Sequence, residues 1–151
     1  MPSGWEWASR PRFEEGGWIA LAAKKTASAR TAAIELGRLA LDRHCRDIVV
    51  LDLRRLSPVT DFFVIATGTS DRQMVSLAHE MGDLAARSFG SKPLSIGGLS
   101  QPTWVLVDCV DVVVHLFDEE HRSYYDLEML WGDAPRVRWE RPASKSKKAG
   151  G

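Results

Sequence analysis

Residues 103–131 read TWVLVDCVDVVVHLFDEEHRSYYDLEMLW. Two apolar runs, residues 104–107 and 112–117, stand on either side of four turn-forming positions, 108–111. Short runs of β-branched residues around a tight polar break are typical of a β-hairpin. Because both runs are apolar at nearly every position, we expect helices to cover at least one of these strands on both faces. We therefore take this hairpin as the part around which the rest of the chain is built.

A helix is predicted directly after the hairpin. Asp118 can cap it, since its carboxylate can accept hydrogen bonds from the first free backbone N–H groups, and Gly132 is a natural stop. Between them stand large side chains: Tyr124, Tyr125, Leu127, Leu130 and Trp131. Adjacent tyrosines point in different directions on a helix, so one of the pair should face outward. An exposed Tyr beside a Trp is typical of a protein interface, although a well-filled core edge explains the same residues.

The rest of the chain supplies further elements of both kinds. Outside residues 103–131 we predict a helix over 29–46, strands over 48–53 and 62–67, a helix over 71–90 and a short strand over 94–96. Ser70 and Gln73 have the spacing of a capping box, which sets the start of the second helix. The order α-β-β-α-β-β-β-α predicts an α/β fold in which helices pack on a mixed β-sheet.

Composition points to one ordinary globular domain. The chain has 151 residues, of which 44% are hydrophobic and 26% charged. The longest early apolar run, residues 18–23, is too short for a membrane span, and it follows Glu14 and Glu15, which disfavours a secretory signal. Cys45 and Cys109 have no CxxC spacing, which predicts reduced thiols, no zinc site and a cytoplasmic location.

Charge and order divide the chain into three parts. We predict a poorly ordered extension over residues 1–28, an α/β domain over 29–135 and a basic disordered tail over 136–151. Residues 31–134 carry sixteen Asp and Glu against nine Lys and Arg. Such an acidic body favours a basic protein partner over direct docking on nucleic acid, although a solvated acidic surface explains the same composition.

Three groups of residues are candidate sites of chemistry. Residues 68–70 precede a predicted helix, whose free backbone N–H groups could hold a phosphate. A tight turn followed by a helix cap needs the same residues. The sequence also contains neither GxxxxGK(S/T) nor GxGxxG, the two glycine motifs typical of nucleotide binding. Asp108 and Asp111 could bind a metal, yet Asp is common beside turns for local reasons. Cys109 and His115 lack an identifiable orienting group. We therefore predict no catalytic residue, no metal site and no cofactor.

Several motifs together resemble the ribosomal silencing factor family, also called RsfS or Iojap. They are DFFV at 61–64, GTSDRQ at 68–73, VVVH at 112–115, and YYDLE at 124–128 followed by Leu130 and Trp131. The resemblance covers roughly residues 30–135, so the Trp-containing first 28 residues lie outside it. At the hairpin the family has Asp-x-Gly-Asp, whereas this chain has Val110. Because a β-branched residue resists positive φ, we expect a turn of another type.

The resemblance implies both a function and a fold. Family members bind the large ribosomal subunit through its fourteenth protein, block joining of the small subunit and so repress translation. They have a nucleotidyltransferase-like topology but are not known as enzymes, and a homodimer is also expected. We expect no membrane contact and no direct sequence-specific binding of nucleic acid. The expected partner-binding residues are Trp104, His115, Asp118, Glu119, Glu120, Arg122, Tyr124, Tyr125, Asp126, Leu127 and Trp131.

Two alternatives belong to other functional classes. A nucleotidyltransferase-like phosphoryl-transfer enzyme would use Gly68, Ser70, Asp108 and Asp111. Such an enzyme needs two nearby carboxylates on a strand after the Gly-Ser turn, whereas this chain begins a helix there at Asp71. The second alternative is an RNA-binding protein that uses the basic tail, but the net negative charge of the domain disfavours binding to RNA. The sequence therefore favours a binding module.

Overall fold

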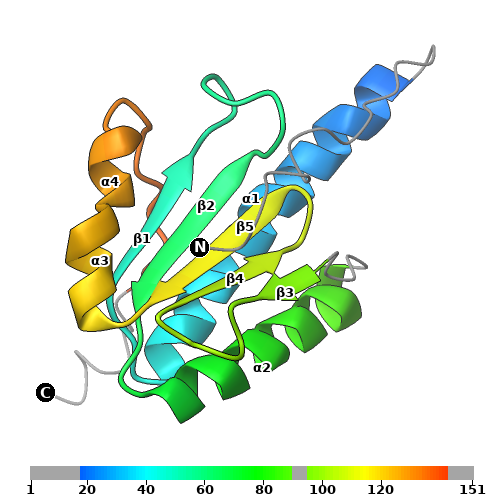
Figure 1. Ribbon diagram of the computed structural model, residues 1–151. Helices are drawn as coiled ribbons and strands as arrows, with labels where there is room; N and C mark the ends of the chain where they lie inside the picture. Colours follow the sequence, from blue (N-terminus) through cyan, green and yellow to red (C-terminus); the bar gives the residue numbers. More distant parts are fainter. Residues whose placement is uncertain (1–17, 90–94, 143–151) are drawn as a thin grey trace, which may run out of the picture.

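The computed structural model describes residues 18–89 and 95–142, with side chains over residues 29–89 and 95–142. In chain order its elements are α1 (Trp18–Asp42), β1 (Arg46–Asp52), β2 (Phe62–Thr67), α2 (Asp71–Phe89), β3 (Ser95–Gly97), β4 (Trp104–Asp108), β5 (Val112–Phe117), α3 (Glu119–Tyr125) and α4 (Leu127–Leu130). Helices α1 and α2 pack on one face of a five-stranded sheet, and α3 and α4 lie on the opposite side (Figure 1). The predicted α/β fold is confirmed.

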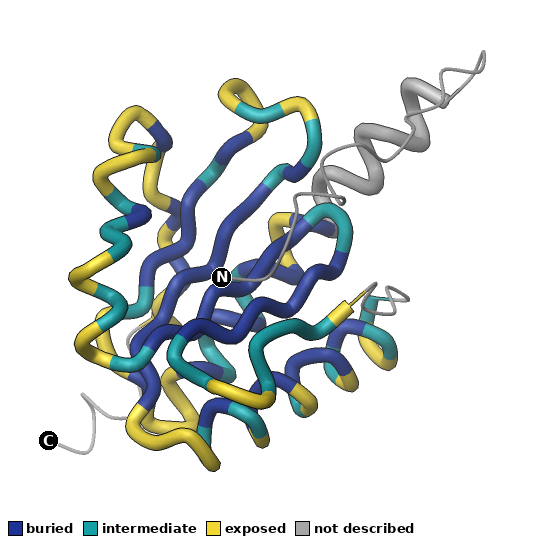
Figure 2. Tube along the Cα trace, viewed as in Figure 1, coloured by how far each residue is buried: buried dark blue, intermediate teal, exposed yellow. Residues whose placement is uncertain are grey.

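The sheet is mixed, as the order of elements predicted. Its strand order is β1-β2-β5-β4-β3, in which β2 and β5 are parallel and every other neighbouring pair is antiparallel. The predicted hairpin is β4 with β5, and its register places Leu106 opposite His115. Every residue of β2 and β5 is buried (Figure 2), which confirms that helices cover the centre of the sheet on both faces.

Alternating strand residues divide the core into two layers. The layer under α1 and α2 contains Val64, Val114 and Leu116, packed against Leu36 of α1 and Met81 of α2. On the opposite face, the strands present Phe63, Ile65, Val113 and Phe117, with Leu127 of α4 packed on them. This second layer also holds His115, a polar side chain that is fully buried among apolar and aromatic ones.

Ordered secondary structure begins before the predicted domain and the described chain continues past its predicted end. Helix α1 begins at Trp18, well before the predicted start at residue 29, and residues 1–17 lie outside the described part. After α4, residues 135–137 run along β1 and residues 139–141 contact α1, although residue 136 was the predicted start of a disordered tail. The Val137 N–H donates to the Val50 carbonyl at 2.8 Å, and Trp139 lies against Gly37 of α1. Residues 143–151 of that tail lie outside the described residues.

The turn of the hairpin differs from the expectation. Val110 has a φ of 73°, the positive value that a β-branched residue resists. The Val110 N–H donates to Asp108 Oδ1 at 2.9 Å, and the Asp111 carbonyl accepts the N–H groups of Asp61 at 3.0 Å and Phe62 at 3.1 Å. The expectation of another turn type is therefore wrong, because these hydrogen bonds hold the turn in a conformation that the valine itself disfavours.

The single helix predicted after Asp118 is two helices. Asp118 does cap the first, since its Oδ1 accepts the His121 N–H at 2.8 Å. The helix then ends at Asp126, which takes the left-handed conformation with φ 45° and ψ 56°. Asp adopts this conformation more readily than most residues. The break redirects the chain, so that Leu127 is buried against the sheet while Leu130 is exposed.

Candidate functional site

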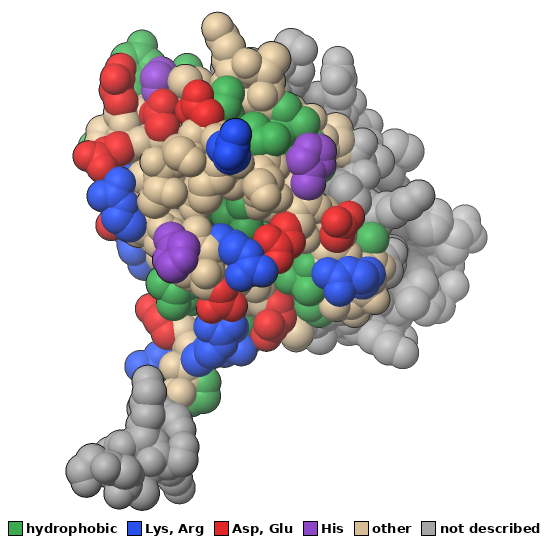
Figure 3. Space-filling view, turned by 90° about the horizontal axis from the view of Figure 1, so that it is seen from below, with side chains coloured by type: hydrophobic (Ala, Val, Ile, Leu, Met, Phe, Trp, Pro, Cys, Tyr) green, Lys and Arg blue, Asp and Glu red, His purple; other side chains and the backbone are tan. Residues whose placement is uncertain are grey.

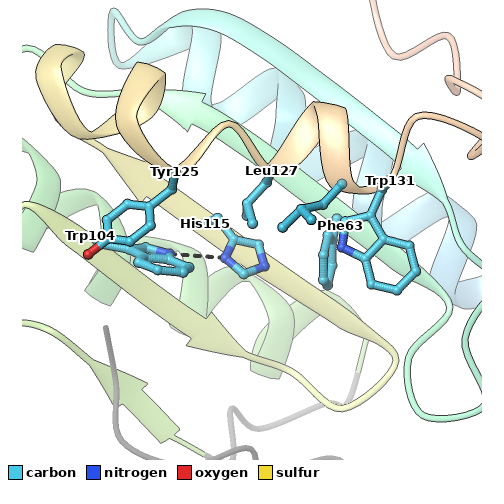
Figure 4. A pocket seen from close by; sticks show the side chains of 7 residues that line it. Phe63, Trp104, His115, Tyr125, Leu127 and Trp131 are labelled. Carbon is cyan, nitrogen blue, oxygen red and sulfur yellow. Dashed lines mark hydrogen bonds between the residues drawn. The ribbon is translucent and has the colours of Figure 1, made fainter.

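A groove lies between the sheet and the two short helices. Its volume is about 320 Å³, and its lining is mostly apolar and aromatic (Figure 4). We call this feature the aromatic groove; its lining residues are Phe63, Trp104, His115, Tyr125, Leu127, Leu130 and Trp131. Five of these seven residues were predicted as partner-binding residues. The structure brings their side chains together although they are far apart in the sequence.

Two sets of ring contacts form the two ends of the aromatic groove. The ring centroid of Trp104 lies 4.5 Å from that of Tyr125 and 4.9 Å from that of Phe117. At the other end, Trp131 meets Phe63 edge to face, with a centroid distance of 5.7 Å. Trp104 is buried, whereas Tyr125 and Trp131 are half-buried. Trp104 therefore fills the core beside the groove, and Tyr125 and Trp131 can reach a partner.

His115 lies at the base of the aromatic groove. It is fully buried, and burial lowers the pKa of its imidazole to about 3, so the ring is neutral at physiological pH. The Trp104 indole N–H donates to His115 Nδ1 at 3.1 Å. Its other ring nitrogen, Nε2, has no hydrogen-bond partner among the described residues. Although predicted as a partner-binding residue, His115 offers nothing on the surface of the free protein.

Arg122 fixes the two short helices on the sheet. Its side chain is only 10% exposed, and its Nε donates to Glu128 Oε1 at 3.0 Å. Its Nη1 donates to the Thr67 hydroxyl, at the end of β2, at 2.9 Å. Arg136 adds a longer contact of 3.4 Å to the same glutamate. Arg122 was predicted to bind the partner, but its geometry makes it a residue that positions α3 and α4.

Three large apolar side chains of the helix pair are exposed. The exposed fractions of the residues are 76% for Tyr124, 77% for Met129 and 74% for Leu130. We call these three residues the apolar ridge. The expected partner-binding residues did not include Met129, Leu130 or Phe63. The break at Asp126 is one reason, because it turns α4 out of the single helical period that the sequence predicted.

Acidic side chains lie in the same segment of the chain as the apolar ridge. Glu119 and Glu120 are exposed, while Asp118 and Asp126 are half-buried. Asp118 is occupied as a cap, and Glu119 forms an exposed ion pair with Arg46 at 2.7 Å. Figure 3 shows acidic and basic side chains interspersed on the face of the molecule seen from below. The acidic excess of the domain is therefore not one continuous patch on that face.

The residues of the phosphoryl-transfer alternative have local roles. Ser70 Oγ accepts the Gln73 N–H at 3.0 Å, so Ser70 caps α2 as predicted. The Gln73 side chain turns back to the N–H of Thr69 at 3.0 Å, and not to that of Ser70 as in a complete capping box. Asp108 accepts the Val110 N–H within the hairpin turn. No group of three or more His, Cys, Asp or Glu residues arranged to hold a metal occurs in the described parts of the chain.

Neither cysteine has the environment of a nucleophile. Both are buried thiols. Burial, together with the nearby Asp108 carboxylate, raises the pKa of Cys109 to about 11, and burial raises the pKa of Cys45. The thiol form therefore dominates at neutral pH, and a thiol is a poor nucleophile compared with a thiolate.

Comparison with known proteins identifies the family. The model of the family described as "Ribosomal silencing factor during starvation" matches residues 26–150, which is most of the chain. The chain belongs to this family. Its members are regulatory factors associated with the ribosome and not enzymes, so the phosphoryl-transfer alternative is set aside. The resemblance seen in the sequence motifs is thereby confirmed.

Individual relatives support the family assignment. The chain is 46% identical to the ribosomal silencing factor RsfS of Bacillus subtilis over 94 residues, covering 62% of this chain and 79% of that protein. It is 37% identical to the chloroplastic protein Iojap of Arabidopsis thaliana over 105 residues, covering 70% of this chain and 43% of that protein. A crystal structure from Chromobacterium violaceum is similar with a TM-score of 0.58 and 31% identity, covering 81% of this chain and 95% of that one. In the described part of this chain, no helix is both long and apolar enough to cross a membrane.

Proposed function

We propose that this protein represses translation by binding the large ribosomal subunit through its fourteenth protein and blocking the small subunit sterically. In this proposal, the aromatic groove and the apolar ridge form the docking surface. The observation that carries the proposal is the exposure of Tyr124, Met129 and Leu130 beside a groove rimmed by half-buried aromatic residues. Exposed large apolar residues gathered in one place are typical of a protein interface.

The position of the apolar ridge distinguishes it from ordinary surface residues. Among the described residues, the other exposed large apolar side chains are Leu41, at the end of α1, and Leu56, in the loop between β1 and β2. Single apolar residues on a surface are common and need no explanation. The three ridge residues, in contrast, lie within one short segment next to Tyr125 and Trp131. Interface energy tends to concentrate on such aromatic anchors.

The charge of the domain suits the proposed partner. Residues 31–134 have an excess of acidic side chains, and a ribosomal protein that contacts RNA is expected to be basic. Glu119 and Glu120 are exposed beside the apolar ridge and can attract a basic surface. A steric mechanism needs only a domain held over the surface that the small subunit must approach. It requires no chemistry from the domain.

The experiment that tests the proposal is co-sedimentation with purified large subunits, followed by crosslinking to identify the neighbouring protein. Tyr124→Ala and Leu130→Ala should each weaken binding by about thirtyfold, the effect of losing about 2 kcal/mol at an anchor. Leu41→Ala and Leu56→Ala are matched controls, because they also remove exposed leucines but lie outside the ridge. Equal binding by the ridge variants and the controls would place the docking surface elsewhere.

A second measurement tests the steric mechanism. The wild-type protein should prevent purified small and large subunits from forming whole ribosomes in a sucrose gradient. Folded ridge variants that have lost binding should allow the subunits to join. A variant that binds poorly but still blocks joining would separate the two activities and contradict the mechanism.

Three further features belong to the same proposal and rest on the family resemblance. They are a nucleotidyltransferase-like topology, a cytoplasmic location and a symmetric homodimer. The apolar ridge supports the dimer, since an exposed apolar surface can also cover itself around a two-fold axis. A dimer closed over the ridge would dissociate before the ridge docks on the ribosome. Light scattering at tens of micromolar, roughly the range in which weak dimers form, should show the dimer. A monomer at that concentration would remove the dimer from the proposal without affecting ribosome binding.

A further inference from the structure

We propose that His115 is a recognition residue whose Nε2–H group, at the base of the aromatic groove, donates a hydrogen bond to an oxygen atom of the partner residue that fills the groove. This inference rests on the proposed function, because it specifies what the docking partner presents to the groove. The oxygen belongs to a main-chain carbonyl or a side-chain hydroxyl. The residue that carries it comes from a basic protein and is otherwise apolar or aromatic.

The hydrogen bond from Trp104 decides which nitrogen of His115 carries the proton. An indole N–H can only donate, so His115 Nδ1, 3.1 Å from Trp104 Nε1, must be the acceptor. Burial keeps the imidazole neutral by lowering its pKa to about 3. A neutral imidazole has one donor and one acceptor nitrogen. The proton is therefore on Nε2, which makes this buried nitrogen a hydrogen-bond donor.

The Nε2–H group lacks an oxygen or nitrogen acceptor in the described structure. Its nitrogen is buried and has no hydrogen-bond partner among the described residues. Figure 4 shows this nitrogen on the side of the ring away from Trp104, facing Phe63. The Phe63 and His115 rings meet edge to face with a centroid distance of 4.4 Å. An aromatic ring is a much weaker acceptor than an oxygen atom. A partner oxygen that displaced the Phe63 ring from this nitrogen would therefore improve the pairing of the donor.

The surroundings of the groove indicate what kind of molecule supplies the oxygen. A volume of about 320 Å³ is at the low end of the range for small-molecule sites, which suits an inserted side chain or a short segment. The groove continues onto the exposed apolar ridge through Leu130, which belongs to both. A small ligand would not need that outer surface, whereas a protein partner would cover it. The exposed acidic residues nearby favour a basic partner.

Binding measurements with three variants test the role of the donor. His115→Phe keeps a planar ring but removes the N–H group, and it should weaken binding to purified large subunits by about tenfold, the effect of one hydrogen bond lost from a buried site. His115→Gln offers both an acceptor for Trp104 and an N–H donor, so it should recover most of the lost affinity. His79→Phe makes the same substitution on the exposed surface of α2 and should bind like the wild type.

Nuclear magnetic resonance provides a readout that does not depend on how well a variant folds. In the isotope-labelled wild-type protein, the His115 ring nitrogens should show the proton on Nε2. Addition of the purified fourteenth large-subunit protein should shift the resonance of this proton downfield. A proton on Nδ1, or a resonance that does not respond to the partner, would overturn the inference.

The outcomes separate this inference from the proposed function. If the wild type does not sediment with large subunits, the proposed function fails. If the wild type sediments but Tyr124→Ala and Leu130→Ala bind normally, the docking surface lies elsewhere. The inference fails in either case. If those tests succeed but folded His115→Phe binds like the wild type, only the inference is overturned. Equal weakening by folded His115→Phe and His115→Gln would also overturn it, because the effect would then not follow the N–H donor.

Discussion

The guanidinium group of Arg122 holds the carboxylate of Glu128 across the break between α3 and α4, with Nε 3.0 Å from Oε1. The same side chain reaches Thr67 of β2 at 2.9 Å, so one residue links both helices to the sheet. The apolar ridge occupies the two helices that this pair connects. The geometry of the apolar ridge therefore depends on the Arg122–Glu128 ion pair, whose side chains are mostly buried.

Replacement of Arg122 should destabilise the protein and displace the apolar ridge. Arg122→Leu leaves the Glu128 carboxylate, 26% exposed, without its main partner, and we expect a loss of about 2 kcal/mol in the free energy of unfolding. Urea denaturation measures this loss. The control is Arg46→Leu, which removes the exposed ion pair with Glu119 and should cost less than about 1 kcal/mol. Equal losses in the two variants would contradict a special role for the Arg122 pair.

Replacement of Val110 by glycine should stabilise the protein. Val110 has a φ of 73°, a conformation that glycine adopts without the steric cost that valine incurs. After the greater chain entropy of glycine in the unfolded state is subtracted, the expected gain is about 1 kcal/mol in urea denaturation. Val112→Gly, in the buried strand β5, is the contrasting variant and should be clearly destabilising. A loss of stability in Val110→Gly would show that the side chain contributes more packing than strain.

The stability of the wild type should fall as the pH falls from about 7 to about 5. Burial lowers the pKa of His115 in the folded protein to about 3, whereas the unfolded chain has the ordinary value near 6.5. Between those two values the unfolded state binds more protons, so acidification favours unfolding. The contribution of this one group is about 2 kcal/mol at pH near 5. In His115→Gln the contribution of His115 to the pH dependence of stability should be missing, while the contribution of the carboxylates is retained. Identical pH profiles of the two proteins in urea denaturation would contradict the prediction.

The two cysteines should react slowly with a thiol reagent in the native protein. A pKa of about 11 for Cys109, against the ordinary value of 9.0, reduces its thiolate fraction by about 100-fold, and burial blocks access as well. Labelling of Cys45 and Cys109 should therefore proceed at the rate of unfolding and become fast in urea. Mass spectrometry after a timed pulse measures both sites. Rapid labelling of either cysteine without denaturant would show that the core opens locally.

Reversal of the exposed acidic charges should slow the approach of the partner. Glu119→Lys and Glu120→Lys change residues beside the apolar ridge without removing a buried side chain. Such charges mainly set the association rate, so both variants should associate more slowly at low salt, and the difference should fade as salt screens the charges. Asp83→Lys, on the exposed side of α2, is the control. An effect that persists at high salt would point to a direct contact instead of long-range attraction.

Sequence patterns predicted the strands better than the turns. The bounds of β2 and β5 were predicted correctly, because each is a continuous apolar run between residues that end a strand. The break at Asp126 was missed, since it depends on one residue adopting φ 45° within a segment whose pattern suits a helix. The positive φ of Val110 was also missed, because the hydrogen bonds around its turn come partly from residues 61 and 62, far away in the sequence.

The candidate site was predictable in part for similar reasons. Aromatic residues in the second half of the chain suggested a recognition surface, and the structure gathers Trp104, Tyr125 and Trp131 around one groove. Their exposure could not be read from the sequence, because it depends on how the helices turn at Asp126. The pairing of Trp104 with His115 depends on the register of β4 against β5, which spacing along the chain does not determine.

The segment after α4 completes the sheet in a way that bears on synthesis of the chain. The Asp52 N–H donates to the Pro135 carbonyl at 2.9 Å and the Val137 N–H to the Val50 carbonyl at 2.8 Å, so residues 135–137 cover part of the outer edge of β1. An uncovered strand edge can pair with another chain and start aggregation. During translation, this edge stays open until residue 137 has been made and released from the ribosomal tunnel. A nascent chain that stops short of this point would leave backbone groups of β1 free to pair with another polypeptide chain. Only a chain that continues past residue 137 can cover that part of the edge.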